Sequence, residues 1–257
     1  IVLLALRRQL TYRAAMWAGL ATNLFFGVLR AFVMIALYGE RNEVAGLTIQ
    51  DAITYTALSQ AVIAYLSIFG WWDVMESVNS GEIAADMLRP MSYLRFWLGV
   101  DLGRALVNLV MRGATILVIY ALFVDLTLPA TLWQWLLFVP ALLLSWLVSF
   151  GWRFLLNLAA FWTPNARGIG RFGFGIIWVL SGFYMPLSLY PQWFQALCAM
   201  TPFPAMVSTP LQIFLGQISG PALLAALLNQ AVWAVVLLAL AHFTLNRGVR
   251  RLVIQGG

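Results

Sequence analysis

The chain has 257 residues, of which 63% are hydrophobic and only 9% charged, and its mean hydropathy is +0.89. A soluble domain carries about a quarter charged residues, so this composition excludes an ordinary soluble protein. The formal net charge is +6, and every basic side chain is arginine, because the chain has no lysine. A phosphate-binding loop of the G-x-x-x-x-G-K type requires lysine, so ATP hydrolysis by this chain is excluded.

Six long apolar stretches account for most of the sequence. A bilayer core takes about 20 helical residues to cross, and each stretch has roughly that length. We therefore predict an all-α integral membrane protein, one transmembrane domain over residues 1–257, with six spanning helices. The stretches cover residues 19–38, 52–72, 98–124, 132–150, 169–185 and 223–245. Because the chain opens on Ile1 rather than Met, we expect residues to be missing before it.

The arginines gather beside alternate gaps between these stretches. Positive charge near span ends stays on the cytoplasmic side, which predicts that both termini and the second and fourth gaps are cytoplasmic. This distribution also explains the basic net charge without a nucleic acid partner. The arginines concerned are Arg7, Arg8, Arg13, Arg89, Arg95, Arg104, Arg167, Arg171, Arg247, Arg250 and Arg251.

The gap over residues 73–97 has apolar side chains at helical spacing. In the run 80–90, Ile83, Met87 and Leu88 fall on one face of a helix, and Glu82 and Asp86 fall on another. Such a short amphipathic helix fits two interpretations. It either lies on the membrane surface or docks into a soluble subunit.

The segment over residues 186–221 is apolar but interrupted by proline. No continuous helix can cross it, so we expect short re-entrant helices at membrane depth on the outer side, covered by protein. The prolines are Pro186, Pro191, Pro202, Pro204, Pro210 and Pro221.

Charged side chains inside the apolar stretches are few. Arg30, Arg112 and Arg153 should face the interior of the helix bundle, because a charge at mid-membrane costs at least about 2.5 kcal/mol. Arg30 either lines a route for a polar or anionic solute or bonds carbonyls of a neighbouring helix. Asp101 is the carboxylate nearest to lying inside a span, so proton-coupled transport has little support.

Two features of the sequence suggest an enzyme, a dinucleotide-site pattern and a serine–histidine pair. Residues 168–173 fit the pattern G-x-G-x-x-G, but the strand and acidic residue that a dinucleotide site needs are missing, so the glycines fit close helix packing better. An intramembrane hydrolase would pair Ser181 with His242, the only histidine, yet no nucleophile motif surrounds that serine. No catalytic residue and no metal ligand is therefore assigned.

Three segments together resemble the membrane subunit of a bacterial ATP-binding-cassette exporter of the type-2 permease superfamily, close to the drug and viologen exporters. They are Asn79–Pro90, the proline-broken Pro186–Pro221 and the tail Asn246–Arg251. The resemblance implies location in the bacterial plasma membrane and a second permease subunit, identical or related. It also implies two copies of a separate cytoplasmic ATPase, which would hold ATP and Mg²⁺, whereas this chain would bind no cofactor of its own.

The resemblance assigns roles to two groups of residues. The helix between the second and third spans becomes a coupling helix that contacts the ATPase, through Gly81, Glu82, Ile83, Asp86, Met87, Leu88, Arg89 and Pro90. A solute route is expected along Asn23, Phe26, Arg30, Tyr55, Tyr65, Phe183 and Tyr184. The predicted function is ATP-driven export of a small hydrophobic or amphipathic solute by alternating access. The alternatives are a membrane anchor that assembles soluble partners and, more remotely, the hydrolase.

Overall fold

A computed structural model describes residues 13–251 of the chain, with side chains from Trp17 onward. Arg7 and Arg8, which we predicted to be cytoplasmic, lie outside the described residues. The α-helices are α2 (Arg13–Tyr38), α3 (Ile49–Leu66), α4 (Asp73–Ser80), α5 (Ile83–Met87), α6 (Tyr93–Asn108), α7 (Thr115–Phe123), α8 (Leu132–Leu158), α9 (Ala166–Leu180), α10 (Gln192–Ala199), α11 (Ser208–Phe214) and α12 (Gly220–Val249). A π-helix, η1 (Leu109–Ala114), joins α6 to α7, and a hairpin of β1 (Glu43–Val44) and β2 (Leu47–Thr48) precedes α3.

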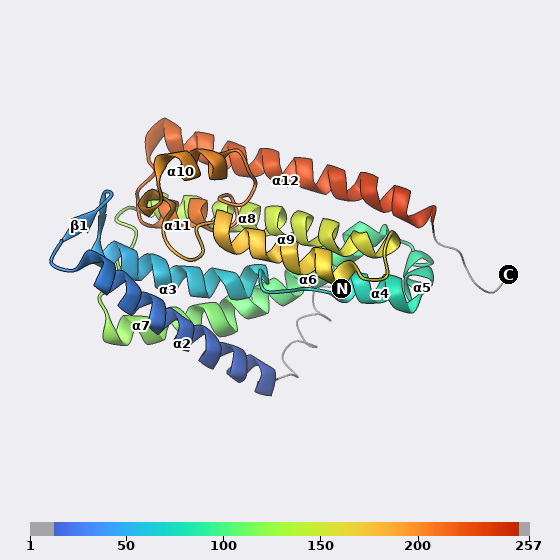
Figure 1. The fold of residues 1–257 in the computed structure, drawn as a ribbon, viewed down its shortest axis with the longest axis horizontal. Helices are drawn as coiled ribbons and strands as arrows, with labels where there is room; N and C mark the ends of the chain where they lie inside the picture. Colours follow the sequence, from blue (N-terminus) through green and yellow to red (C-terminus); the bar gives the residue numbers. More distant parts are fainter. Residues whose placement is uncertain (1–12, 252–257) are drawn as a thin grey trace.

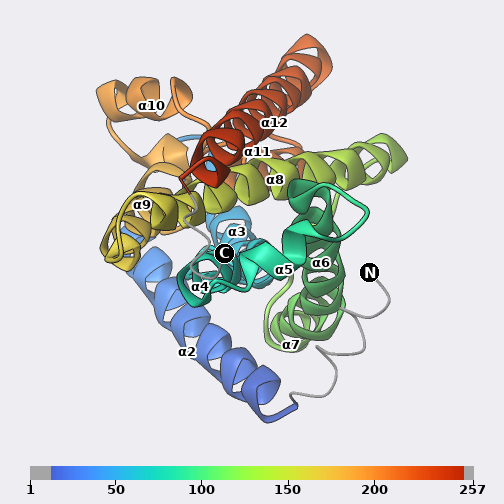
Figure 2. The same cartoon turned by 90° about the vertical axis from the view of Figure 1, so that its right-hand side faces the viewer.

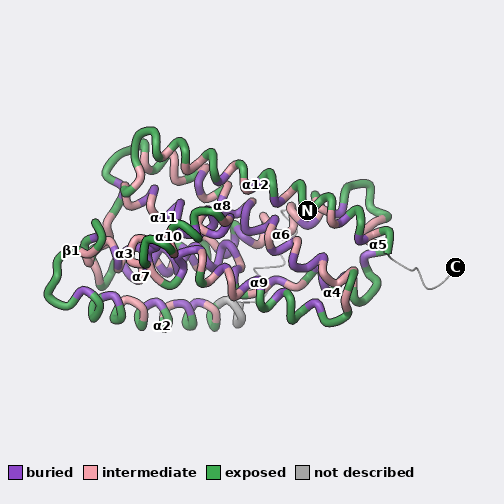
Figure 3. Tube along the Cα trace, turned by 45° about the horizontal axis from the view of Figure 1, so that its top comes forward, coloured by how far each residue is buried: buried purple, intermediate pink, exposed green. Residues whose placement is uncertain are grey.

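The long helices run along the long axis of an elongated bundle (Figure 1). The β1–β2 hairpin, α10 and α11 lie at one end, and α4 and α5 lie at the other (Figure 1). Two helices organise the interior. Helix α8 packs against α12, α11, α9 and α4, and helix α3 packs against α2, α6, α7 and η1. Exposed positions follow the outer faces of α2 and α12, while buried positions concentrate between them (Figure 3).

Within residues 13–251, four helical stretches are long and apolar enough to cross a membrane. They are Trp17–Tyr38, Tyr93–Phe123, Leu132–Phe161 and Gly220–Val249. The second is the continuous rod of α6, η1 and α7. The structure is therefore that of an all-α, multi-pass membrane protein, as the composition predicts.

The other two predicted spans, 52–72 and 169–185, are shorter helices. Helix α3 ends at Leu66, because Ser67 takes a left-handed conformation with φ of 52°. Helix α9 has 15 residues and stops at Leu180, just before Gly182 with φ of 79°. Helix α3 also buries polar side chains such as Thr56 and Ser59, which bond carbonyls of α3 itself. Such a helix suits a position covered by other helices rather than by lipid.

The remaining predicted spans are longer than expected. The helix predicted at 98–124 begins at Tyr93, the one at 132–150 continues to Leu158, and the one at 223–245 covers Gly220–Val249. Between α9 and α12 the proline-rich segment forms a 3-10 turn (Leu187–Leu189), α10 and α11, with no continuous helix. It is fastened to the bundle, because Gln230 on α12 donates a hydrogen bond to the Ala205 carbonyl at 2.8 Å.

Helices α8 and α12 approach closely at Gly151. A Cβ on this residue would lie 2.8 Å from Leu237 Cβ, so even alanine requires the helices to shift. We expect Gly151→Ala to lower the free energy of unfolding by about 1–3 kcal/mol, the usual cost of overpacking. Gly175→Ala is the matched control, because a Cβ there meets nothing within 4 Å. Denaturation in detergent should show a loss for the first variant only; equal stabilities would contradict close packing at Gly151.

Candidate functional site

Helices α4 and α5 form a compact segment, residues 73–90, at one end of the bundle; we refer to it as the end segment (Figures 1 and 2). Gly81 separates the two helices with φ of 80°, a left-handed conformation that glycine adopts without strain. Of the helix predicted within residues 80–90, only Ile83–Met87 forms α5, and a separate helix that was not predicted, α4, precedes it.

The start of the end segment is fastened to α8 by one side chain. Asn157 Oδ1 accepts a hydrogen bond from the Met75 N–H at 2.9 Å, and Asn157 Nδ2 donates to the Trp71 carbonyl at 2.8 Å. The buried amide thus bonds the backbone on either side of the N-terminus of α4. At the surface, Arg167 of α9 pairs with Glu76 of α4 at 2.7 Å. These bonds connect α4 to α8 and α9.

The face of the end segment that was predicted to contact a partner, with Ile83, Met87 and Leu88, differs from the face that the structure exposes. Ile83 is fully buried, in the main core of the protein, and Met87 is half-buried and packs against that core. Leu88 points the other way, with 87% of its surface exposed. The three side chains therefore do not share one exposed face, because the bundle covers Ile83 and Met87 and Leu88 follows the last residue of α5. Sequence reasoning missed Ala84 and Ala85, which are exposed together with Gly81, Glu82, Leu88, Arg89 and Pro90.

The second half of the end segment is ordered by Asp86. Its carboxylate pairs with Arg89 at 2.8 Å, as the i,i+3 spacing predicts, and accepts a hydrogen bond from Ser77 Oγ at 3.3 Å. The Arg89 guanidinium lies 4.1 Å from the centroid of the Phe96 ring on α6. Asp86 therefore links α4, α5 and, through Arg89, α6.

The end segment is acidic on a protein that is otherwise basic. Asp73, Glu76, Glu82 and Asp86 line one recess of about 440 Å³ beside α5, together with Arg89. A neighbouring recess between α5 and the end of α12 is mainly apolar and is lined by Met87 and His242. The exposed Leu88 belongs to a surface with negative charge close by, which favours a partner with complementary basic groups.

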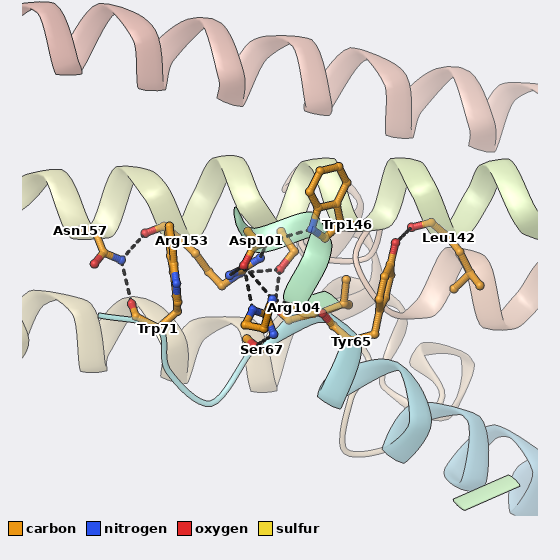
Figure 4. Close-up of polar contacts among 11 residues, drawn as sticks. Tyr65, Ser67, Trp71, Asp101, Arg104, Leu142, Trp146, Arg153 and Asn157 are labelled. Atoms are coloured by element: carbon orange, nitrogen blue, oxygen red, sulfur yellow. Dashed lines mark hydrogen bonds and ion pairs between the residues drawn. The ribbon is translucent and has the colours of Figure 1, made fainter. Parts of the chain in front are cut away.

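A cluster of buried charges lies behind the end segment, where α3, α6 and α8 meet (Figure 4). Asp101 is 1% exposed and Arg153 is fully buried. Arg153 makes two hydrogen bonds to the Asp101 carboxylate, at 3.0 and 2.7 Å, and Arg104 makes two more, at 2.9 and 2.7 Å. Trp146 Nε1 donates a fifth at 2.8 Å. We refer to Asp101, Arg104 and Arg153 as the Asp101 cluster.

The Asp101 cluster also holds the end of α3. Arg104 donates hydrogen bonds to Ser67 Oγ and to the Tyr65 carbonyl, and Ser149 Oγ, itself bonded to Arg153, donates to the Leu66 carbonyl. These acceptors lie where α3 terminates, so arginine replaces the missing intrahelical donors. The i,i+3 spacing of Asp101 and Arg104 is a local sequence signal for their ion pair. The partner Arg153, 52 residues away, has no such signal.

The predicted route residues are only partly brought together. Arg30 donates to the carbonyls of Phe183 and Tyr184, bonds Ser59 Oγ at 3.1 Å, and lies 4.5 Å from the Phe183 ring centroid. Tyr55 donates to the Gly182 carbonyl at 2.8 Å. Arg30 and Tyr55 thus bind the residues that follow α9, which matches the carbonyl-bonding interpretation of Arg30. Tyr184 is 44% exposed beside them.

Three other route residues lie elsewhere. Tyr65 points to α8, donating to the Leu142 carbonyl at 3.2 Å (Figure 4). Phe26 is 51% exposed, and its ring contacts that of Phe25. Asn23 is buried between α2 and α3 and lines a small recess with Arg112.

The structure does not assemble the hydrolase pair. Ser181 follows α9 and accepts the Ser208 N–H at its carbonyl, whereas His242 bonds Asn246 on α12 and lines the recess with Met87 of the end segment. Among residues 17–251 no group of three potential metal ligands occurs either.

The fold, four membrane-crossing stretches and the buried polar links define a multi-pass membrane protein. The family model described as ABC-2 family transporter protein matches residues 24–256, so the chain belongs to this family. It is accordingly a permease component of an ABC transporter, and membership implies an ABC ATPase partner in general. No curated protein matches the chain.

Proposed function

We propose that this chain is the permease subunit of an ATP-driven exporter that moves a small hydrophobic or amphipathic solute out of the cytoplasm by alternating access. Six spans would be formed by α2, α3, the α6–α7 rod, α8, α9 and α12. The end segment and both termini would face the cytoplasm of a bacterial cell. The arginine distribution supports this orientation, because Arg89, Arg167 and Arg247 belong to the end segment or to the adjacent ends of α9 and α12.

The observation that carries the proposal is the end segment itself. It presents exposed Leu88 with Ala84 and Ala85, while Ile83 and Asn157 hold it into the bundle. An exposed apolar side chain on a rigidly attached segment suits a knob that fits a groove in a partner. The membrane-surface alternative explains Leu88 equally, but not the surrounding carboxylates, since an anionic membrane repels them. We therefore place a cytoplasmic ATPase against this surface.

Movement would pass from the ATPase to the spans through two links. Asn157 joins α4 to α8, and the Asp101 cluster joins α8 to α6 and to the end of α3. Because both links consist of buried bonds, a push on Leu88 shifts packed helices as units rather than bending α5 alone. A pair of ATPases and a second permease, identical or related, would complete the transporter.

The test is purification of the subunit from native membranes in mild detergent, with identification of the proteins that accompany it. We expect an ABC ATPase that hydrolyses ATP and is stimulated by the exported solute. Stable recovery with other soluble proteins and without ATP hydrolysis would instead establish the membrane-anchor alternative.

The proposed solute route lies where Arg30 and Tyr55 bond the residues that follow α9. Tyr184 is its most accessible residue. We expect Tyr184→Ala to raise the solute concentration for half-maximal transport about tenfold, the effect of losing an aromatic contact of roughly 1.4 kcal/mol. Stability should change little, because the side chain is 44% exposed. Phe172→Ala on α9, where the ring is 74% exposed, is the control. Identical kinetics for both variants would remove Tyr184 from the route.

A further inference from the structure

Arg112 lies within the π-helix η1, near the middle of the α6–α7 rod. Its Nε is buried without a hydrogen-bond partner, and no ion pair forms with it among the described residues. A π-helix displaces side chains from the regular helical register and occurs frequently at functional positions. An arginine at this depth whose buried Nε has no partner within the described part of the chain requires an explanation.

Within residues 17–251, the carboxylate that lies in the spanning stretches is already paired with other arginines. Asp101 is the one acidic residue in the four described spanning stretches, and it already accepts four hydrogen bonds from Arg104 and Arg153. Residues 1–12 contain neither Asp nor Glu. The Asp101 cluster therefore keeps one positive charge in excess, and Arg112 adds a second nearby.

Arg112 lines a recess of about 160 Å³ between the first half of α2, the last turn of α3 and η1. The recess combines polar groups, the Asn23 amide and the Ser67 hydroxyl, with apolar walls from Ile63, Ala64 and Phe69. Arg104 donates a hydrogen bond to the Ser67 hydroxyl, so a second arginine contacts a residue of the recess lining. The α2 backbone can approach because residue 19 is glycine, where a Cβ would meet Arg112 Nη2 at 2.5 Å.

We propose that this recess binds the anionic head group, phosphate or carboxylate, of an amphiphile. A guanidinium with an amide and a hydroxyl beside it matches the oxygen atoms of such a group. The volume fits a head group but not a whole drug-sized solute, whose sites occupy about 300–1,000 Å³. The apolar tail would therefore remain outside. The Phe69 ring lies 5.6 Å from that of Phe183, which connects the recess to the route beside Arg30.

This inference deepens the proposed function by naming the class of solute, and it rests on that function only for the fate of the bound amphiphile. The source of the head group is either an exported amphiphile or a membrane phospholipid. Both present the same chemistry to Arg112, and the experiment separates them.

The experiment measures binding of radiolabelled dodecyl phosphate to the full chain in phosphatidylcholine nanodiscs. We expect Arg112→Gln to weaken binding at least about tenfold, the effect of losing one charge-assisted hydrogen bond. Arg112→Lys should retain most of the affinity, and Gly19→Leu, which keeps the charge but places a side chain against the Arg112 guanidinium, should lose it. Arg95→Gln on the exposed face of α6 is the control. Dodecanol should not compete with the labelled probe.

Equal affinities for the wild type, Arg112→Gln and Gly19→Leu would overturn the proposal. Competition by phosphatidylglycerol added to the nanodiscs would identify a lipid head group, and unchanged binding would identify a free amphiphile; both support the anion site. Because binding needs no ATPase, Arg112-dependent binding without transport would refute only the exporter function. Transport of the amphiphile that is indifferent to Arg112 would refute only this site.

Discussion

Asp101→Asn is expected to lower the free energy of unfolding by about 3–5 kcal/mol, because it leaves the buried Arg153 without its counter-charge. The neutral amide keeps the shape of the side chain but cannot accept two bidentate guanidinium groups. In this variant Arg104 keeps its hydrogen bonds to Ser67 and to the Tyr65 carbonyl. Arg153 keeps only its hydrogen bond to Ser149. Thermal denaturation of the purified chain in detergent measures the loss.

The matched control is Asp125→Asn, since Asp125 is exposed in the connection between α7 and α8. Its effect should stay within about 0.5 kcal/mol. A double variant that also carries Arg153→Gln should be more stable than the sum of the two single losses predicts, by about 0.5–3 kcal/mol, because the pair acts as a unit. Additive losses would show that Asp101 and Arg153 are not coupled in the membrane.

Leu88→Asp is expected to weaken ATPase assembly about thirtyfold and to abolish solute-stimulated ATP hydrolysis, if Leu88 fills a groove in the partner. Truncation of a residue that anchors an interface costs 2 kcal/mol or more, which corresponds to about that factor. The side chain is 87% exposed, so the substitution should not alter the fold of the free permease. Affinity between the purified permease and its ATPase is the measurement.

Leu128→Asp is the control for added charge at an exposed leucine, because Leu128 lies between α7 and α8, near the opposite end of the bundle. It should leave ATPase binding unchanged. Glu82→Arg probes the charge of the same surface and should weaken binding less than Leu88→Asp, as a rim charge does. Met87→Asp is a poorer probe, because Met87 packs against the core and its replacement disturbs folding as well. Unchanged assembly in Leu88→Asp would rule out this docking surface.

The buried bonds that hold the helices together are also the contacts through which movement of the end segment would reach the spans. The Asp101 cluster and Asn157 occupy the positions through which the end segment meets α3, α6 and α8. A buried charge network is weak support for stability by itself, since burial costs almost as much as pairing returns. Its value here lies in geometry, because five directed bonds to one carboxylate permit few relative positions of the helices.

Much of the architecture was predictable from sequence, for a physical reason. A bilayer requires long apolar helices with satisfied backbone groups, so hydropathy alone placed the stretches that became α2, α6–α7, α8 and α12. Proline located the interruption that follows Met185, whereas the break at Gly81 was not predicted. The i,i+3 spacing likewise predicts the Asp86–Arg89 pair.

Other features depended on contacts between distant segments. Periodicity predicted Ile83, Met87 and Leu88 on one face of a helix, but α5 ends at Met87 and packs on the core, so that Leu88 is the exposed one of the three. The early end of α3 at Leu66 depends on Ser149 and Arg104, which bond its last carbonyls from other helices. Asp101 and Arg153 are far apart in the chain, so their pairing had no local signal.

The sequence by itself thus determined the class of protein, its membrane stretches and the place of the end segment, because these follow from hydropathy, charge and backbone chemistry within a few turns. Tertiary structure alone decided which charges pair between different helices and which are left over. Asp101 satisfies Arg104 and Arg153, Arg30 is satisfied by carbonyls after α9, and Arg112 receives neither. That difference arises because a buried charge is governed by its neighbours in space, whatever their separation along the chain.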